Sequence, residues 1–272
     1  MAEATVRLRK AAFAGSFYPA APAELHALVG DLVQAGAPVA QAALAGRRPM
    51  AIVAPHGPYT WSGAQSGQAW AAVQQLRGTL DRVVLLGPSH RFAQRGFFVP
   101  ESHAWLTPLG IAPLDYQAVS SLLTRPDVLR AELAHDREQS LELQVPFVQH
   151  VLGNVPLVPI AVGEVDAQVV AGILDQLWPD DRTLVVVSTD LASDVDAHTA
   201  KVLSAATARQ VQALDGAALT PARCCGWSAL AGLLLAARQR HLQGHTLSVG
   251  ASAVSGLQQA TGYGAFVLSA AA

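Results

Sequence analysis

Cysteine, lysine and charged residues in general are scarce in this 272-residue chain. Charged residues make up 14% of it, the formal net charge is −2, and lysine occurs only at Lys10 and Lys201. Without a basic run, the chain is a poor partner for nucleic acid or for an anionic membrane surface. Its two cysteines, Cys224 and Cys225, are sequence neighbours and cannot build a disulfide framework. We therefore expect a protein of the reducing cytoplasm.

Long hydrophobic runs are missing as well. No apolar run approaches the ~18 to 20 residues that span a bilayer. The N-terminal stretch MAEATVRLRKAAFAG carries charge but lacks the apolar core of a signal peptide. The chain is nevertheless 51% hydrophobic, which is enough for a sizeable buried core. These observations predict a globular protein without a membrane partner.

Short β-branched runs alternate with helical patterns along the whole chain. SFYPAAPAELHALVGDLVQAGA predicts a helix that stops near Gly36, and residues 137–153 predict a helix whose start is kinked or broken at Pro146. Four runs are typical of buried strands: MAIVAP, DRVVLLGPS, VPLVPIAVG and TLVVVSTDLAS. The alternation predicts one α/β domain over residues 1–272, with a mostly parallel mixed sheet and helices on both of its faces.

Three of the predicted strands end on a residue that can bind a metal. His56 follows AIVAP, His90 follows VVLLGPS, and Asp190 follows LVVVST. Ligands of open α/β sheets bind beyond the carboxyl ends of the strands. Two imidazoles and one anionic group are the usual minimum for a catalytic metal site with open coordination positions. The spacing of His56 and His90 forms no local motif, so the alternative is that each ring caps a turn.

Two further features favour a site near these strand ends. Tyr59, in HGPYTWSG, is placed either to donate a hydrogen bond to a ligand or to pack in the core. Cys224 and Cys225 precede an apolar helix, and a thiol at a helix N-terminus has a lowered pKa. Thiolate binds zinc, copper and iron. The alternative is a buried cysteine that acts as a small hydrophobic side chain.

Several strings in this order resemble the Memo family, whose bacterial and archaeal members are also called AmmeMemoRadiSam system protein B. The likeness runs from about Ala12 to Ser269 and rests on AFAGSFYPA, IVAPHGPYTWSG, VVLLGPSHR, REQSLELQVPF, VPIAVGE, VVVSTDLAS and CCGWSAL. The resemblance implies a fold similar to that of class III extradiol dioxygenases, which hold a non-haem iron with two histidines and a carboxylate. In the Memo family the triplet is two histidines and a cysteine, which match His56, His90 and Cys225.

The chain departs from the family pattern at two positions beside the implied pocket. Gln139 stands where the family usually has the histidine of a Glu-His-Ser string, and Ser193 stands where it has the histidine of an Asp-x-x-His string. Neither replacement titrates near neutral pH, and general acid–base help is typically worth ~10²- to 10⁴-fold. We expect a weakened acid/base shell around the metal, formed by Asp190, Gln139, Ser193 and Tyr59. Compensation would require His135 or His198 to approach the pocket.

The resemblance implies a Memo-like metal-binding protein with a redox role or a role beside a radical-SAM protein, and an unidentified small-molecule ligand. Mixed histidine and cysteine ligation suits iron, copper and zinc, and the relation to iron oxygenases favours iron. One alternative is a non-catalytic partner or scaffold of a radical-SAM protein. Another is a metallohydrolase with a zinc-bound water and Asp190 or Glu138 as general base.

Overall fold

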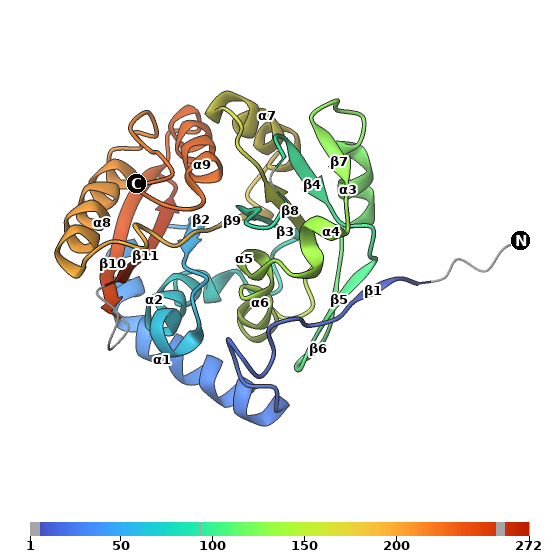
Figure 1. Cartoon of the computed structure of the whole chain (residues 1–272), viewed down its shortest axis with the longest axis horizontal. Coiled ribbons are helices and arrows are strands. Elements are labelled where there is room, and N and C mark those ends of the chain that lie inside the picture. Colours follow the sequence, from blue (N-terminus) through green and yellow to red (C-terminus); the bar gives the residue numbers. More distant parts are fainter. Residues whose placement is uncertain (1–5, 93, 254–258, 272) are drawn as a thin grey trace, which may run out of the picture.

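Four β-branched runs form the centre of an eight-stranded sheet (Figure 1). A computed structural model describes residues 6–92, 94–253 and 259–271. The central strands are adjacent and parallel, in the order β2 (Pro49–Ala54), β9 (Thr183–Ser188), β3 (Arg82–Pro88) and β8 (Leu157–Val162). Nearly all their residues are buried, as expected for parallel strands that are covered on both faces.

Shorter or antiparallel strands extend the sheet on each side. At one edge β11 (Ala260–Ser269) pairs antiparallel with β2, and β10 (Gln243–Ala253) pairs antiparallel with β11. At the other edge β4 (Phe97–Val99) runs antiparallel to β8, followed by β7 (Val128–Arg130). A separate three-stranded sheet joins β1 (Leu8–Arg9), β5 (Ala104–Thr107) and β6 (Gly110–Pro113).

Helices cover both faces of the large sheet. The alternating strand residues divide between two hydrophobic clusters, with Ile52, Leu85 and Val186 in one and Val53, Leu86 and Val187 in the other. The first cluster contains α1 (Pro22–Leu44), α2 (Tyr59–Ala71), α5 (Gln139–Glu142) and α6 (Val145–Val151). The second contains α3 (Tyr116–Leu122), α7 (Ala167–Leu177), α8 (Ala197–Gln212) and α9 (Trp227–Gln239). The predicted fold class, α/β with a mostly parallel mixed sheet between two helical layers, is confirmed.

Helix α1 is longer than predicted. It does not stop near Gly36 but continues past Pro38 to Leu44, where Ala45 adopts a left-handed conformation with φ 46°. Gly36 is a packing residue, because a Cβ atom there would lie 2.6 Å from the Cα atom of Gln68 in α2. A glycine that permits close helix–helix contact therefore has the same local appearance in the sequence as a helix stop.

The start of the helix around Pro146 is broken, as predicted. α5 ends at Glu142, and α6 begins at Val145 with Pro146 in its first turn, where a missing N–H group costs nothing. Two short helices, α4 (Leu133–Asp136) and the 3₁₀ turn η1 (Gln74–Leu76), complete the described elements.

By length and composition alone, α1 is the one helix of the described residues that could cross a membrane. Helices in the layers of globular proteins pass the same test. In this structure α1 packs along α2 through one face, made of Leu25, Val29, Val33, Gly36, Ala40 and Leu44. It therefore forms part of the outer helical layer.

Candidate metal centre

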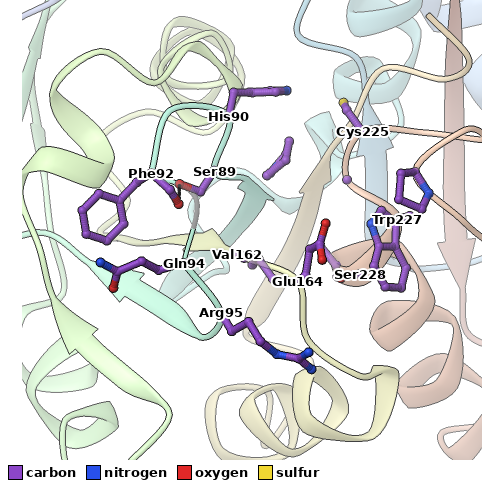
Figure 2. Close-up of a pocket in the computed structure, with 15 residues that line it drawn as sticks. Ser89, His90, Phe92, Gln94, Arg95, Val162, Glu164, Cys225, Trp227 and Ser228 are labelled. Atoms are coloured by element: carbon purple, nitrogen blue, oxygen red, sulfur yellow. Dashed lines mark hydrogen bonds between the residues drawn. The ribbon is translucent and has the colours of Figure 1, made fainter.

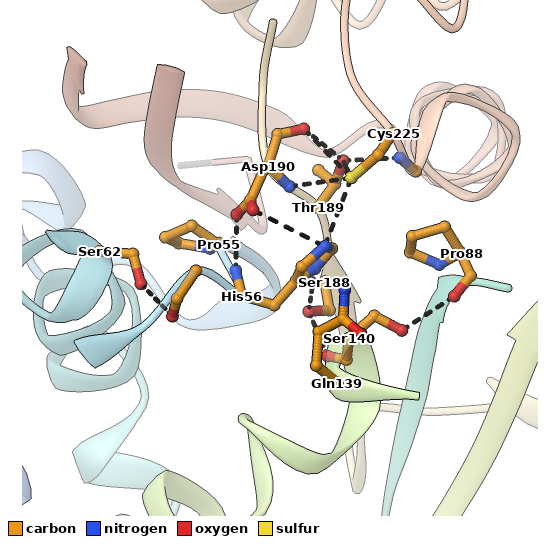
Figure 3. A network of polar contacts seen from close by, with 12 residues as sticks. Pro55, His56, Ser62, Pro88, Gln139, Ser140, Ser188, Thr189, Asp190 and Cys225 are labelled. Carbon is orange, nitrogen blue, oxygen red and sulfur yellow. Dashed lines mark hydrogen bonds and ion pairs between the residues drawn. The ribbon is translucent and has the colours of Figure 1, made fainter. Parts of the chain in front are cut away.

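The carboxyl ends of the central strands bring the predicted site residues together. His56 follows β2, His90 follows β3 and Asp190 follows β9. Cys225 comes from the segment just before α9 and is held beside the end of β9, where its N–H group donates to the Asp190 carbonyl at 3.3 Å. Figure 3 shows His56, Asp190 and Cys225 converging above the end of the sheet.

The three predicted metal ligands form a compact donor set. The ligand atoms of His56, His90 and Cys225 all lie within 4.8 Å of one another, and His56 Nε2 lies 3.4 Å from Cys225 Sγ. With metal–nitrogen and metal–sulfur bonds of ~2.0 and ~2.3 Å, a tetrahedral ion requires about 3.5 Å between these atoms. The two imidazole rings are 5.2 Å apart between centroids and inclined by 76°. The residues present therefore fit a mononuclear ion with at least one open position.

A buried hydrogen-bond relay fixes the tautomer of His56. The Ser188 hydroxyl donates to the Ser140 carbonyl at 2.6 Å and accepts from Gln144 Nε2 at 2.9 Å. It can therefore only accept at its third contact, 3.1 Å from His56 Nδ1. Gln144 is oriented in turn by Trp70, whose indole N–H group donates to Gln144 Oε1 at 2.9 Å. The proton of neutral His56 must lie on Nδ1, and the Nε2 lone pair points toward Cys225.

Replacing Ser188 with alanine should weaken metal binding without unfolding the protein. The variant leaves the Nδ1–H group of His56 without its acceptor, and loss of such a partner typically costs ~10- to 100-fold in metal affinity. Competition with a chromogenic chelator measures this affinity. Ser204→Ala is the matched control, because Ser204 is equally buried but lies in α8. Equal affinities of the two variants would contradict the relay.

Glu138 orients the ring of His90, as Ser188 orients that of His56. One carboxylate oxygen accepts from the His90 backbone N–H group at 2.7 Å, and the other lies 2.8 Å from His90 Nδ1. Burial disfavours the charged ring, but hydrogen bonds to Cys225 and Glu138 outweigh it and raise the pKa of His90 to about 9. The hydrogen bond and charge of His90 in turn lower the pKa of Glu138 against its burial. A metal ion that bound to His90 would therefore have to displace a proton.

Asp190 holds His56 and Cys225 in position. Its Oδ1 atom accepts from the His56 backbone N–H group at 2.7 Å, and its Oδ2 atom lies 3.8 Å from His56 Nε2. Its own backbone N–H group donates to Cys225 Sγ at 3.3 Å. Cys224, by contrast, is fully buried, and burial raises the pKa of its thiol. Of the two neighbouring thiols, Cys225 is the one that faces the histidines.

The remaining predicted site residues, Gln139, Tyr59 and Ser193, lie in different surroundings. Gln139 lies beside the centre, with Nε2 3.4 Å from His90 Nδ1. Tyr59 lies in the core against Tyr18 and Phe147, and its hydroxyl donates to the Leu143 carbonyl at 2.5 Å. Ser193 is exposed in the segment that follows β9. The structure brings Gln139, but not Tyr59, to the three ligands.

Neither histidine considered as a replacement belongs to the donor set of His56, His90 and Cys225. His198 is exposed in the first turn of α8. His135 is fully buried, with its Nε2 atom 3.0 Å from the Phe98 carbonyl and its ring against Trp105. The positions of Gln139 and Ser193 are therefore not compensated by these two rings.

His135 should make the stability of the protein depend on pH. Burial, followed by the charge of Arg9, lowers the pKa of His135 to about 3. Below pH ~6.5 the unfolded chain binds a proton that the folded chain does not, so this part of the stability is lost as the pH falls toward 3. By pH 5 the loss is about 2 kcal/mol. Chemical unfolding at pH 7 and pH 5 should show a smaller difference for His135→Gln, and an unchanged difference would contradict this assignment.

A cavity of about 380 Å³ opens beside the centre (Figure 2). His90 and Cys225 form part of its wall, so a molecule in it has access to two of the three ligands. Its other side chains include Ser89, Phe92, Gln94, Arg95, Glu164, Trp227 and Ser228. Sequence reasoning missed most of this wall, together with the roles of Ser188 and Glu138 as partners of the histidines. The available signal was position, since Ser188 ends β9 and Glu164 follows the end of β8.

Comparisons with known proteins place the chain in a family. The family model described as "Memo-like protein" matches residues 9–248. A MEMO1 family protein of Aquifex aeolicus is 31% identical over 200 residues, which cover 72% of this chain and 71% of that protein. A MEMO1 family protein of Thermotoga maritima is 29% identical over 243 residues, which cover 83% and 87% of the two chains. The crystal structure of the uncharacterized protein JW3007 from Escherichia coli K12 aligns with a TM-score of 0.49 and 16% identity, covering 81% of this chain and 99% of that one. The match of the family model to most of the chain shows that this protein belongs to the Memo family.

Proposed function

We propose that this protein is a mononuclear metal protein in which His56, His90 and Cys225 hold a redox-active ion. The observation that carries the proposal is the donor set itself, with all ligand atoms within 4.8 Å and both imidazoles oriented by buried partners. A bound ion would supply Lewis-acid and redox chemistry. The chain's own residues orient the ligands through Ser188, Glu138 and Asp190. The adjacent cavity takes a small organic substrate.

Iron is the favoured ion in this proposal. A thiolate with two imidazoles suits iron, copper and zinc alike, and the resemblance of the family to class III extradiol dioxygenases supports iron. The Cys225 thiol is partly exposed, and a thiolate beside a redox metal and oxygen is readily oxidised. A free and partly exposed thiol such as that of Cys225 fits a reducing cytoplasm.

Metal analysis of protein purified without oxygen tests the proposal. We expect about one ion per chain in the wild type, and less than a tenth of that in His56→Ala and His90→Ala, because each variant removes one of three protein ligands. His198→Ala is the matched control, since it removes an exposed imidazole from α8. Equal metal content in all four proteins would overturn the proposed function.

A second candidate function is a non-catalytic partner of a radical-SAM protein. Gln139 and Ser193 favour it, because neither side chain can exchange a proton near neutral pH. Co-purification of a radical-SAM protein from the source cell supports this candidate, and its absence counts against it. The metallohydrolase hypothesis has less support. Asp190 and Glu138, either of which would serve as its general base, are already engaged by His56 and His90.

A further inference from the structure

Glu164 lies at the strand end next to His90. Strands β3 and β8 are parallel, and their register pairs Pro88 with Val162. The Ser89 N–H group extends this ladder by donating to the Val162 carbonyl at 3.1 Å. His90 lies two residues beyond Pro88, and Glu164 lies two residues beyond Val162. Both residues therefore follow the paired strand ends by the same number of positions.

Four adjacent strands thus each end on a titratable side chain. Across β2, β9, β3 and β8 these residues are, in order, His56, Asp190, His90 and Glu164. Asp190 is engaged by His56, and His90 is engaged by Glu138. Glu164 is exposed and makes no side-chain hydrogen bond or ion pair among the contacts of residues 6–92, 94–253 and 259–271. Its carboxylate is free to meet a ligand.

The Glu164 carboxylate lines the cavity beside the metal centre. Among the lining residues, all of which lie in the described part of the chain, Glu164 is the only acidic one. Figure 2 shows its carboxylate between Arg95 on one side and the ligands His90 and Cys225 on the other. Trp227 and Phe92 add aromatic surface to the walls. A molecule bound in the cavity beside the centre therefore shares it with one carboxylate, that of Glu164.

Glu164 contributes the one carboxylate among the residues that line this cavity. The side chains of Gln139 and Ser193 are poor proton acceptors, whereas a carboxylate is chemically able to accept a proton. We propose that Glu164 is a catalytic residue of this site, which accepts a proton from a weakly acidic hydroxyl of the substrate. The proposal rests on the proposed function, because it requires a substrate in the cavity beside the centre.

The step is a simple proton transfer. The substrate O–H bond breaks, a new O–H bond forms on the Glu164 carboxylate, and the electron pair stays on the substrate oxygen. Because Glu164 is exposed, it can then release the proton to solvent. The charged or ionisable groups that line the cavity with it are Arg95, His90 and Cys225.

The test uses 4-nitrocatechol, a chelating phenol that changes colour when it loses a proton. Zinc-loaded full-length protein is mixed with the probe in a stopped-flow spectrometer, so that no redox chemistry contributes. We expect Glu164→Gln to slow the absorbance change by about 100-fold or more, the range of general acid–base catalysis. Added acetate should restore the rate in Glu164→Ala, which a purely structural role would not explain. Glu24→Gln, an exposed glutamate in the first turn of α1, is the matched control.

The outcomes separate this proposal from the metal site. Unchanged rates in Glu164→Gln, or a zinc-loaded wild type that does not bind the probe, would overturn the role of Glu164. A wild-type protein that binds neither zinc nor iron in the same preparation would overturn the proposed function instead. Zinc content is measured on each variant, and equal content in wild type and Glu164→Gln is expected because Glu164 is not a ligand.

Discussion

Cys225→Ala is expected to lower the affinity of this protein for its metal by more than 100-fold, while Cys224→Ala leaves it unchanged. Cys225 Sγ lies 3.4 Å from His56 Nε2 and accepts from the Asp190 N–H group. Loss of a supporting residue costs up to ~100-fold in metal affinity, and loss of a ligand costs more. Chelator competition and metal analysis measure the difference.

The neighbouring cysteine provides an unusually close control. Cys224 carries the same thiol one residue earlier, but it is fully buried within the hydrophobic cluster of α7 and α9. Its replacement by alanine removes a small hydrophobic contact and no ligand. If Cys224→Ala lost the metal and Cys225→Ala kept it, the assignment of the sulfur ligand would be wrong.

Arg9→Leu is expected to destabilise the protein by about 3–5 kcal/mol, the usual cost of removing one partner of a buried ion pair. Arg9 Nη1 lies 2.7 Å from Glu142 Oε2, and both side chains are 1% exposed. Glu142 also accepts from the Tyr18 hydroxyl and from the backbone N–H groups of Ala12 and Phe13. The variant leaves this carboxylate buried without its cation.

The same substitution should also weaken the metal site. Arg9 donates through Nε to the His135 carbonyl at 2.8 Å and through Nη2 to the Glu138 carbonyl at 3.4 Å. It therefore fixes the backbone from which Glu138 reaches His90.

Denaturant unfolding measures the stability, and Arg182→Leu, which breaks the exposed pair with Asp81, is the control with little expected change. A double variant, Arg9→Leu with Glu142→Leu, should recover part of the loss, because it removes the orphaned charge. Equal effects of Arg9→Leu and Arg182→Leu would contradict this account.

The sequence predicts the centre of the fold well because parallel strands buried on both faces read as continuous apolar runs. His56, His90 and Asp190 were visible as the polar residues that end three such runs. Cys224 and Cys225 were visible as thiols before an apolar helix, but the choice of Cys225 came from the family resemblance, since nothing in its spacing links it to strands far away in the chain. The structure makes that link through the contact of Cys225 with Asp190.

What the sequence did not reveal depends on three-dimensional packing. The continuation of α1 past Gly36 requires knowledge of α2, whose backbone approaches that glycine. Tyr59 lies three residues after His56, yet its ring turns into the core because Tyr18 and Phe147 offer it an apolar contact. Glu164 acquires its significance only from the register of β3 with β8.

The most direct test of the account is X-ray absorption spectroscopy of the metal-loaded protein. We predict one sulfur neighbour at ~2.3 Å and two imidazole nitrogens at ~2.0–2.1 Å from a single ion, with the sulfur lost in Cys225→Ala and retained in Cys224→Ala. A spectrum of the wild-type protein that contains only nitrogen and oxygen neighbours would contradict a centre built from His56, His90 and Cys225.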